Sequence, residues 1–150
     1  MRILTGLVVC LMGLMGQALP PKATPGALNP AVAQGNLNKT VCVANWTKTV
    51  RPPASFMNKL KAAQMAALGL RGVAHDYEED HRVPLEVGGN PTDPRNLWPE
   101  PWAHPYGAHE KDRLENAVKR DLCGGSLTLA QARAIFLGDF WTEYKRRFGK

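Results

Sequence analysis

The longest apolar stretch of the chain lies at its N-terminus, where residues 3–15 follow Arg2 without a charged side chain. Gly16 and Ala18 then supply small residues suited to a cleavage site. The stretch is short for a membrane-spanning helix. The pattern predicts a secretory signal peptide over residues 1–18; the alternative is an uncleaved membrane anchor.

Further along, apolar residues recur with helical spacing, and Ser55 and Thr128 stand where helix caps are expected. A segment rich in acids at its start and bases at its end suits the helix dipole. The pattern predicts helices over residues 55–68 (ended by Gly69), 108–122, 129–137 and 139–148.

Between the first two of these helices, the spacing changes to that of extended chain. Residues 76–87 read as a strand because Val83, Leu85 and Val87 alternate, with Pro84 favouring a sheet edge. Gly88 and Gly89 form a turn, and a second short strand starts at residues 97–98. The order ribbon, turn, ribbon, helix, with more helices on either side, predicts an α+β fold.

Residues 19–40 form an extended arm or linker in this interpretation, because their early part is rich in Pro, Ala and Gly and shows no periodicity. Residues 41–150 make up a single domain, since a chain of 150 residues is too short for two sizeable cores.

Charge is unevenly distributed in a chain of formal net charge +6. Residues 19–75 contain seven basic side chains and no acidic one, whereas residues 76–100 contain seven acidic side chains and two basic ones. A basic surface attracts polyanions such as nucleic acid, and clustered carboxylates attract divalent cations. The pattern suits a metal-dependent enzyme acting on a phosphodiester; the alternative is ordinary solvated charge.

Two cysteines, Cys42 and Cys123, remain once the predicted signal peptide is removed. An even pair in an exported chain predicts a disulfide. The alternative is two buried free thiols. Neither cysteine has a second cysteine or histidine at metal-ligand spacing.

The densest chemistry lies in residues 80–97, where an Asp-His pair precedes the Gly-Gly turn and an Asn-Leu pair follows it. Hydrolysis of a phosphodiester needs a base to activate water and a cation to neutralise the leaving oxygen. His81 fits the base, Asp80 a metal ligand, and Asn96 a group that orients the histidine.

These residues, together with Pro84-Leu85, resemble the HNH endonucleases, whose site is a ββα-metal finger. Residues 77–81 and 96–101 also resemble a group of small exported HNH-like bacterial proteins, over about residues 25–141. The resemblance implies that Asp80 binds the metal, His81 is the general base and Asn96 positions it. It implies a second ligand from the following helix, which offers His109 first and Asp112 second, with Glu115 a turn further on.

The function expected from this resemblance is a secreted or periplasmic endonuclease that uses a divalent ion such as Mg, Mn, Zn or Ni. We expect a monomer without a stable membrane span, acting on nucleic acid, with DNA as the expected substrate. The alternatives are an inactive module that binds nucleic acid or an anionic envelope polymer, and a structural envelope protein. The candidate phosphate contacts are Arg95, Lys111, Arg113 and Arg120.

Overall fold

A two-stranded antiparallel ribbon lies at the centre of the computed structural model, which describes residues 19–102 and 106–149. Strand β1 (Tyr77–His81) pairs with β2 (Leu97–Pro101), so that Glu78 lies opposite Glu100 and His81 opposite Leu97. The predicted signal peptide, residues 1–18, lies outside the described residues.

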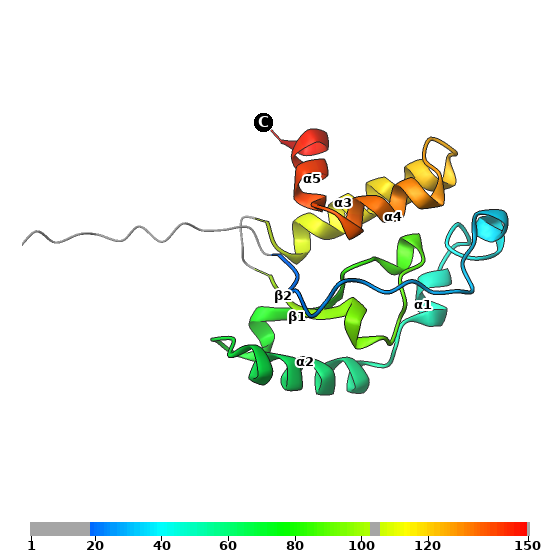
Figure 1. Ribbon diagram of the computed structural model, residues 1–150. Helices are drawn as coiled ribbons and strands as arrows, with labels where there is room; N and C mark the ends of the chain where they lie inside the picture. Colours follow the sequence, from blue (N-terminus) through cyan, green and yellow to red (C-terminus); the bar gives the residue numbers. More distant parts are fainter. Residues whose placement is uncertain (1–18, 103–105, 150) are drawn as a thin grey trace, which may run out of the picture.

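Helices cover the ribbon on both sides (Figure 1). Helix α2 (Ala54–Leu68) runs along one side, and α3 (Ala108–Cys123), α4 (Leu129–Leu137) and α5 (Phe140–Phe148) form a layer on the other. A short helix α1 (Trp46–Val50) lies at one end of the ribbon. The architecture is therefore α+β, as the sequence predicts.

Capping residues explain the ends of these helices, and one predicted cap is wrong. Gly69 ends α2 in the left-handed conformation, and the Thr128 side chain caps α4 by accepting a hydrogen bond from the Gln131 backbone. The predicted cap Ser55 lies inside α2, because Pro53 occupies the cap position and already has the extended backbone that a helix start requires.

The first strand is shorter than the sequence predicts, since it ends at His81 instead of continuing to Val87. Pro84 cannot donate to a strand partner, and the Asn96 side chain bonds both backbone groups of Val83. The chain then turns through a short 3₁₀ helix, Leu85–Val87. Val83, Leu85 and Val87 are all buried, but in a folded loop that packs against the helical layer.

The arm over residues 19–40 is not a loose linker, which corrects the interpretation from composition. Leu28 forms a β-bridge with Gly89, and Gly26 donates to the carbonyl of Arg95 at 2.9 Å. The side chain of Val32 is 3% exposed and belongs to the core. The loop between the strands offers unpaired backbone groups, and the arm satisfies them.

The core lies between the loop and the α3–α5 layer, around Phe136, Phe140 and Trp141. The predicted disulfide is present: Cys42, beside the core, bonds to Cys123 at the end of α3. Among residues 19–102 and 106–149, no helix combines the length and apolar character needed to cross a membrane.

Candidate active site

The end of β1 places Asp80 against helix α3. The Asp80 side chain is almost fully buried, and its Oδ1 accepts a hydrogen bond from the His81 backbone N–H at 2.7 Å. Its Oδ2 accepts a hydrogen bond from Lys111 Nζ at 2.5 Å. Both oxygens of the expected metal ligand are therefore already bonded to donors of the protein.

The Lys111 ammonium is enclosed at the junction of β1 and α3. It donates to Asp80 Oδ2, to the His81 carbonyl at 2.8 Å and to Glu115 Oε1. The ring of Phe136 closes another side, with its centroid 5.9 Å from Nζ. An ammonium has three N–H donors, so three acceptors satisfy it completely.

Burial and nearby charges shift the pKa values of the buried groups around Lys111. Burial opposes charge on Asp80, but Lys111 and hydrogen bonds lower the pKa of Asp80 to about 2. Burial raises the pKa of Glu100 well above its usual value, and the nearby Asp80 adds to this effect against the opposing influence of Lys111. Burial also opposes charge on Lys111, yet the surrounding carboxylates raise the pKa of Lys111 well above its usual value.

His81, the expected base, is held by the loop that joins the strands. Its Nε2 lies 3.0 Å from the carbonyl of Pro91, so the tautomer protonated at Nε2 donates this bond and leaves Nδ1 basic. Burial lowers the pKa of His81 to about 4, against the opposing effects of Asp80 and Pro91. The imidazole is therefore neutral at pH 7, as a general base requires, although the residue is only 2% exposed.

Asn96 acts on His81 through the loop. Its Oδ1 accepts from Val83 N at 2.9 Å, and its Nδ2 donates to the carbonyls of Val83 and Asn90 at 3.0 and 2.9 Å. Asn90 directly precedes Pro91, whose carbonyl bonds the imidazole. The positioning role expected from the resemblance therefore has a physical route, namely backbone bonds that fix the Pro91 carbonyl.

The helix residues expected to complete a metal site lie elsewhere. His109 is exposed, and its ring packs on Trp102 with centroids 4.9 Å apart. Asp112 is also exposed as a whole residue. Its carboxyl group is nevertheless partly buried, which raises the pKa of Asp112, and the nearby Asp80 adds to the effect. Within the part of the chain that the structure describes, no three His, Cys, Asp or Glu side chains are arranged to hold a metal ion.

A divalent ion bound by Asp80 does not fit this arrangement. Such an ion needs several oxygen ligands with free lone pairs, at about 2.0–2.6 Å. Asp80 and Glu115 instead direct oxygens at the Lys111 ammonium, whose charge repels a second cation. The reaction proposed for this site therefore uses no metal ion held by Asp80, His109 and Asp112.

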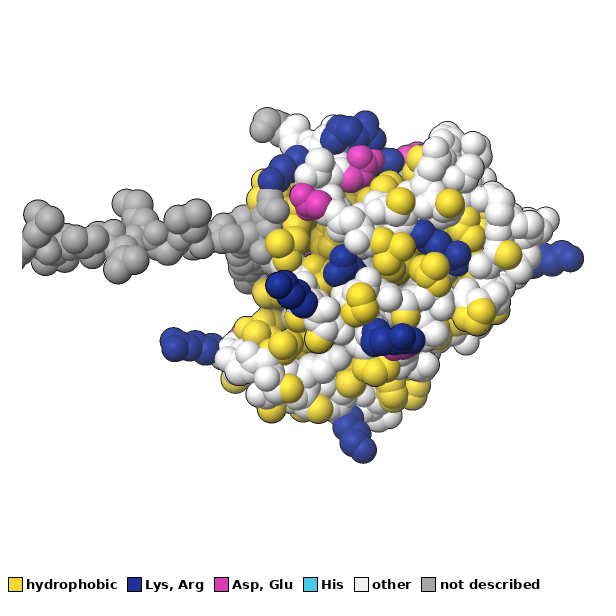
Figure 2. Space-filling view, viewed as in Figure 1, with side chains coloured by type: hydrophobic (Ala, Val, Ile, Leu, Met, Phe, Trp, Pro, Cys, Tyr) yellow, Lys and Arg dark blue, Asp and Glu magenta, His cyan; other side chains and the backbone are white. Residues whose placement is uncertain are grey.

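The four predicted phosphate contacts do not form one surface. Lys111 is buried and ion-paired, so it is not available to a phosphate, which corrects that expectation. Arg113 and Arg120 are exposed on α3, with the Arg113 guanidinium stacked on Phe148. Arg95 pairs with Asp93 at 2.6 Å. Lys and Arg side chains are spread over the face seen in Figure 2 instead of gathering in one patch.

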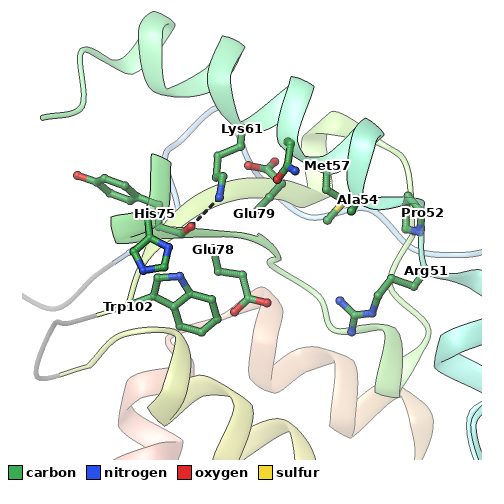
Figure 3. Close-up of a pocket in the computed structure, with 11 residues that line it drawn as sticks. Arg51, Pro52, Ala54, Met57, Lys61, His75, Glu78, Glu79 and Trp102 are labelled. Atoms are coloured by element: carbon green, nitrogen blue, oxygen red, sulfur yellow. Dashed lines mark hydrogen bonds between the residues drawn. The ribbon is translucent and has the colours of Figure 1, made fainter. Parts of the chain in front are cut away.

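A cleft of about 500 Å³ opens between α2 and the outer edge of β1 (Figure 3). Its lining includes Arg51, Glu78 and Trp102, but not His81. The Glu78 carboxyl points away from α2, on the side where the Arg51 guanidinium lies. Arg51 acts electrostatically on both His81 and Glu78.

Sequence reasoning missed Arg51, Glu78 and Glu100 as site residues. In the sequence, Arg51 precedes two prolines, and this pattern indicates only a break between two elements of secondary structure. Burial raises the pKa of Glu78 to about 8, with Asp80 and Asp112 adding to the effect. Strand alternation could have indicated Glu78 as a site residue, because Glu78 and Asp80 are two residues apart on β1 and therefore share a face of the strand.

Comparison of this chain with protein-family models, curated proteins and solved structures gives no match. The resemblance to HNH endonucleases therefore rests on residues 77–101 themselves and on what their geometry can do.

Proposed function

We propose that the chain is an exported HNH-like phosphodiesterase acting on nucleic acid, with the ribbon, its loop and α3 as the finger. The observation that carries the proposal is the His81 imidazole, which is neutral at pH 7 and fixed by the Pro91 carbonyl next to a buried carboxylate. A general base must be unprotonated at the working pH and fixed in orientation.

The reaction assigned to these residues is attack by water on phosphorus. Nδ1 of His81 takes a proton from the water, the new P–O bond forms, and the bond to the leaving oxygen breaks. The leaving oxygen takes a proton from solvent water, and His81 returns its proton to solvent. Arg51, which acts electrostatically on His81 from the cleft, is suited to bind the phosphate and to stabilise the negative charge that develops on it. Trp102, in the same cleft, offers an aromatic face to a base.

A second function is favoured by one specific observation, the 2% exposure of His81. In this second function, the buried His81 holds the loop through Pro91 and takes no part in chemistry. The chain would then be an HNH-like module that binds nucleic acid or an anionic envelope polymer without cleaving it. Arg51 and Trp102 would keep their binding roles in that case.

Plasmid nicking by the purified chain distinguishes the two functions. The assay is run in EDTA and separately with Mg²⁺, Mn²⁺, Ni²⁺ or Zn²⁺, using the wild type and His81→Ala. The nuclease proposal expects cleavage that falls at least about 100-fold in His81→Ala. Circular dichroism and thermal unfolding verify that the variant is folded, and Lys119→Ala serves as a variant remote from the ribbon.

Retention of DNA in a gel shift, with steep salt dependence and no product in any of these buffers, supports the binding module instead. Undiminished cleavage by folded His81→Ala removes His81 from the mechanism. If the chain neither cleaves nor retains DNA or RNA, the result contradicts both the nuclease and the nucleic-acid-binding module.

A further inference from the structure

The junction between β1 and α3 already contains a cation. Lys111 reaches from the first turns of α3 to the end of β1, where its ammonium bonds Asp80, the His81 carbonyl and Glu115. The N–O distances to Asp80 and to the carbonyl are 2.5 and 2.8 Å. These three oxygens form a cage around the ammonium, as oxygen ligands do around a hard metal ion, except that this cation is covalently attached to the chain.

The cage has no vacancy for a second cation. All three ammonium protons are matched by acceptors, and Phe136 covers another side. The side chain of Lys111 is 1% exposed, so its displacement into water requires the helix to move. Removing it while Asp80 and Glu115 stay buried leaves carboxylates without a counter-charge, which is costly in a protein interior.

We infer that Lys111 is the resident cation of this site, so that Asp80 and Glu115 bind no divalent ion while Lys111 is present. The ion implied by the resemblance to HNH endonucleases is replaced by a side chain, and Lys111 orients Asp80 and the end of β1. The inference stands apart from the proposed function, because metal binding is measured directly and needs no cleavage.

The test compares Mn²⁺ binding by wild type, Lys111→Ala and Lys119→Ala, a matched change further along the same helix. Thermal unfolding and the loss of free Mn²⁺ resonance signal are the measurements. An ion bound at 100 times its dissociation constant raises the Tm of a chain of this size by roughly 5–10 °C. We expect no such shift in wild type or Lys119→Ala, and a shift in Lys111→Ala, where the freed carboxylates form a metal site.

Asp80→Asn shows whether any Mn²⁺-dependent Tm shift arises at this site, since it removes one oxygen of the cage without changing the side-chain volume. A shift in wild type that Asp80→Asn removes overturns the inference, and so does a folded Lys111→Ala that binds no Mn²⁺ through Asp80. If Lys111→Ala does not fold, Lys111→Gln, which keeps most of the volume, takes its place. If neither folds, the wild-type and Asp80→Asn titrations alone decide.

Discussion

The side chain of Asn96 joins segments that are far apart in the sequence. It bonds Val83 and Asn90 in the loop and also accepts from the backbone of Ala27 in the N-terminal arm, at 3.3 Å. A buried amide with four partners acts as a fixed spacer. Its effect on His81 is therefore inseparable from its effect on the stability of the loop.

Replacing Asn96 with Ala should lower the free energy of unfolding by about 3 kcal/mol or more, because several buried backbone groups lose their partners. Urea unfolding measures the change. Asn116→Ala is the control: Asn116 is exposed on α3 and donates only to the Asp112 carbonyl of its own helix, so a change within about 0.5 kcal/mol is expected. Equal effects of the two substitutions would contradict the role given to Asn96.

The acid limit of catalysis reports on His81. A histidine of ordinary pKa 6.5 loses basicity as the pH falls through that value, whereas burial lowers the pKa of His81 to about 4. The nicking rate at pH 5.5 should therefore stay within about twofold of the rate at pH 7.5 and decline only near pH 4. A decline centred near pH 6.5 would show that the base is a solvated histidine.

Stability has to be followed in the same buffers. Between pH 6.5 and about 4 the unfolded chain binds a proton at His81 that the folded chain does not. The contribution of His81 to the free energy of unfolding is therefore fully present above pH 6.5 and is lost as the pH falls toward 4. Circular dichroism at each pH separates unfolding from loss of the base.

At the scale of elements, the turn between the strands decides the shape of the site. Gly88 has a φ of +76°, which a side chain disfavours, and Gly89 lies against the backbone of Val83. Arg133 of α4 then bonds the carbonyls of Val87 and Gly88 and that of Val32 in the arm. The Gly-Gly pair is therefore where the loop, the arm and the helical layer meet.

Gly89→Ala should destabilise the protein by more than about 3 kcal/mol, because the new Cβ would lie 1.7 Å from the Val83 carbonyl oxygen, a backbone atom that cannot move alone. Gly35→Ala is the matched control, since its Cβ meets no atom within 4 Å. Thermal unfolding of the two variants measures the difference. A folded Gly89→Ala of wild-type Tm would show that the close approach is not real.

At the scale of the whole molecule, the disulfide connects the N-terminal part of the domain to the helix that carries Lys111. Cys42 and Cys123 are 81 residues apart, so the bond closes a loop that includes the ribbon, α2 and all of α3. Loss of a constraint of this length costs on the order of 4 kcal/mol through the entropy of the unfolded chain.

Reduction should therefore lower the Tm by roughly 10 °C. Thermal unfolding with and without a reductant measures the shift, and the double variant Cys42→Ser/Cys123→Ser should match the reduced wild type. Addition of reductant to that variant is the control and should change nothing. An unchanged Tm of fully reduced wild type, verified by thiol titration, would contradict the prediction.

Short-range information in the sequence was sufficient for the helices and the Gly-Gly turn, and the presence of two cysteines after the predicted signal peptide was sufficient for the disulfide. Helix periodicity, caps and turn residues act over a few positions, so the pattern locates α2 to α5 closely, whereas β1 is shorter than the pattern predicts. The roles given to His81 and Asn96 stay predictions, drawn from a motif whose spacing is local.

Only the tertiary structure decided the electrostatics. Lys111 reads as a surface base on a polar helix, yet it lies on the face that packs on β1, where Asp80 and Glu115 surround it. Burial and pairing depend on which face of α3 meets the ribbon. Composition likewise predicts a loose arm, whereas residues 24–32 dock because the loop presents unpaired backbone groups, which exist only once the loop has folded.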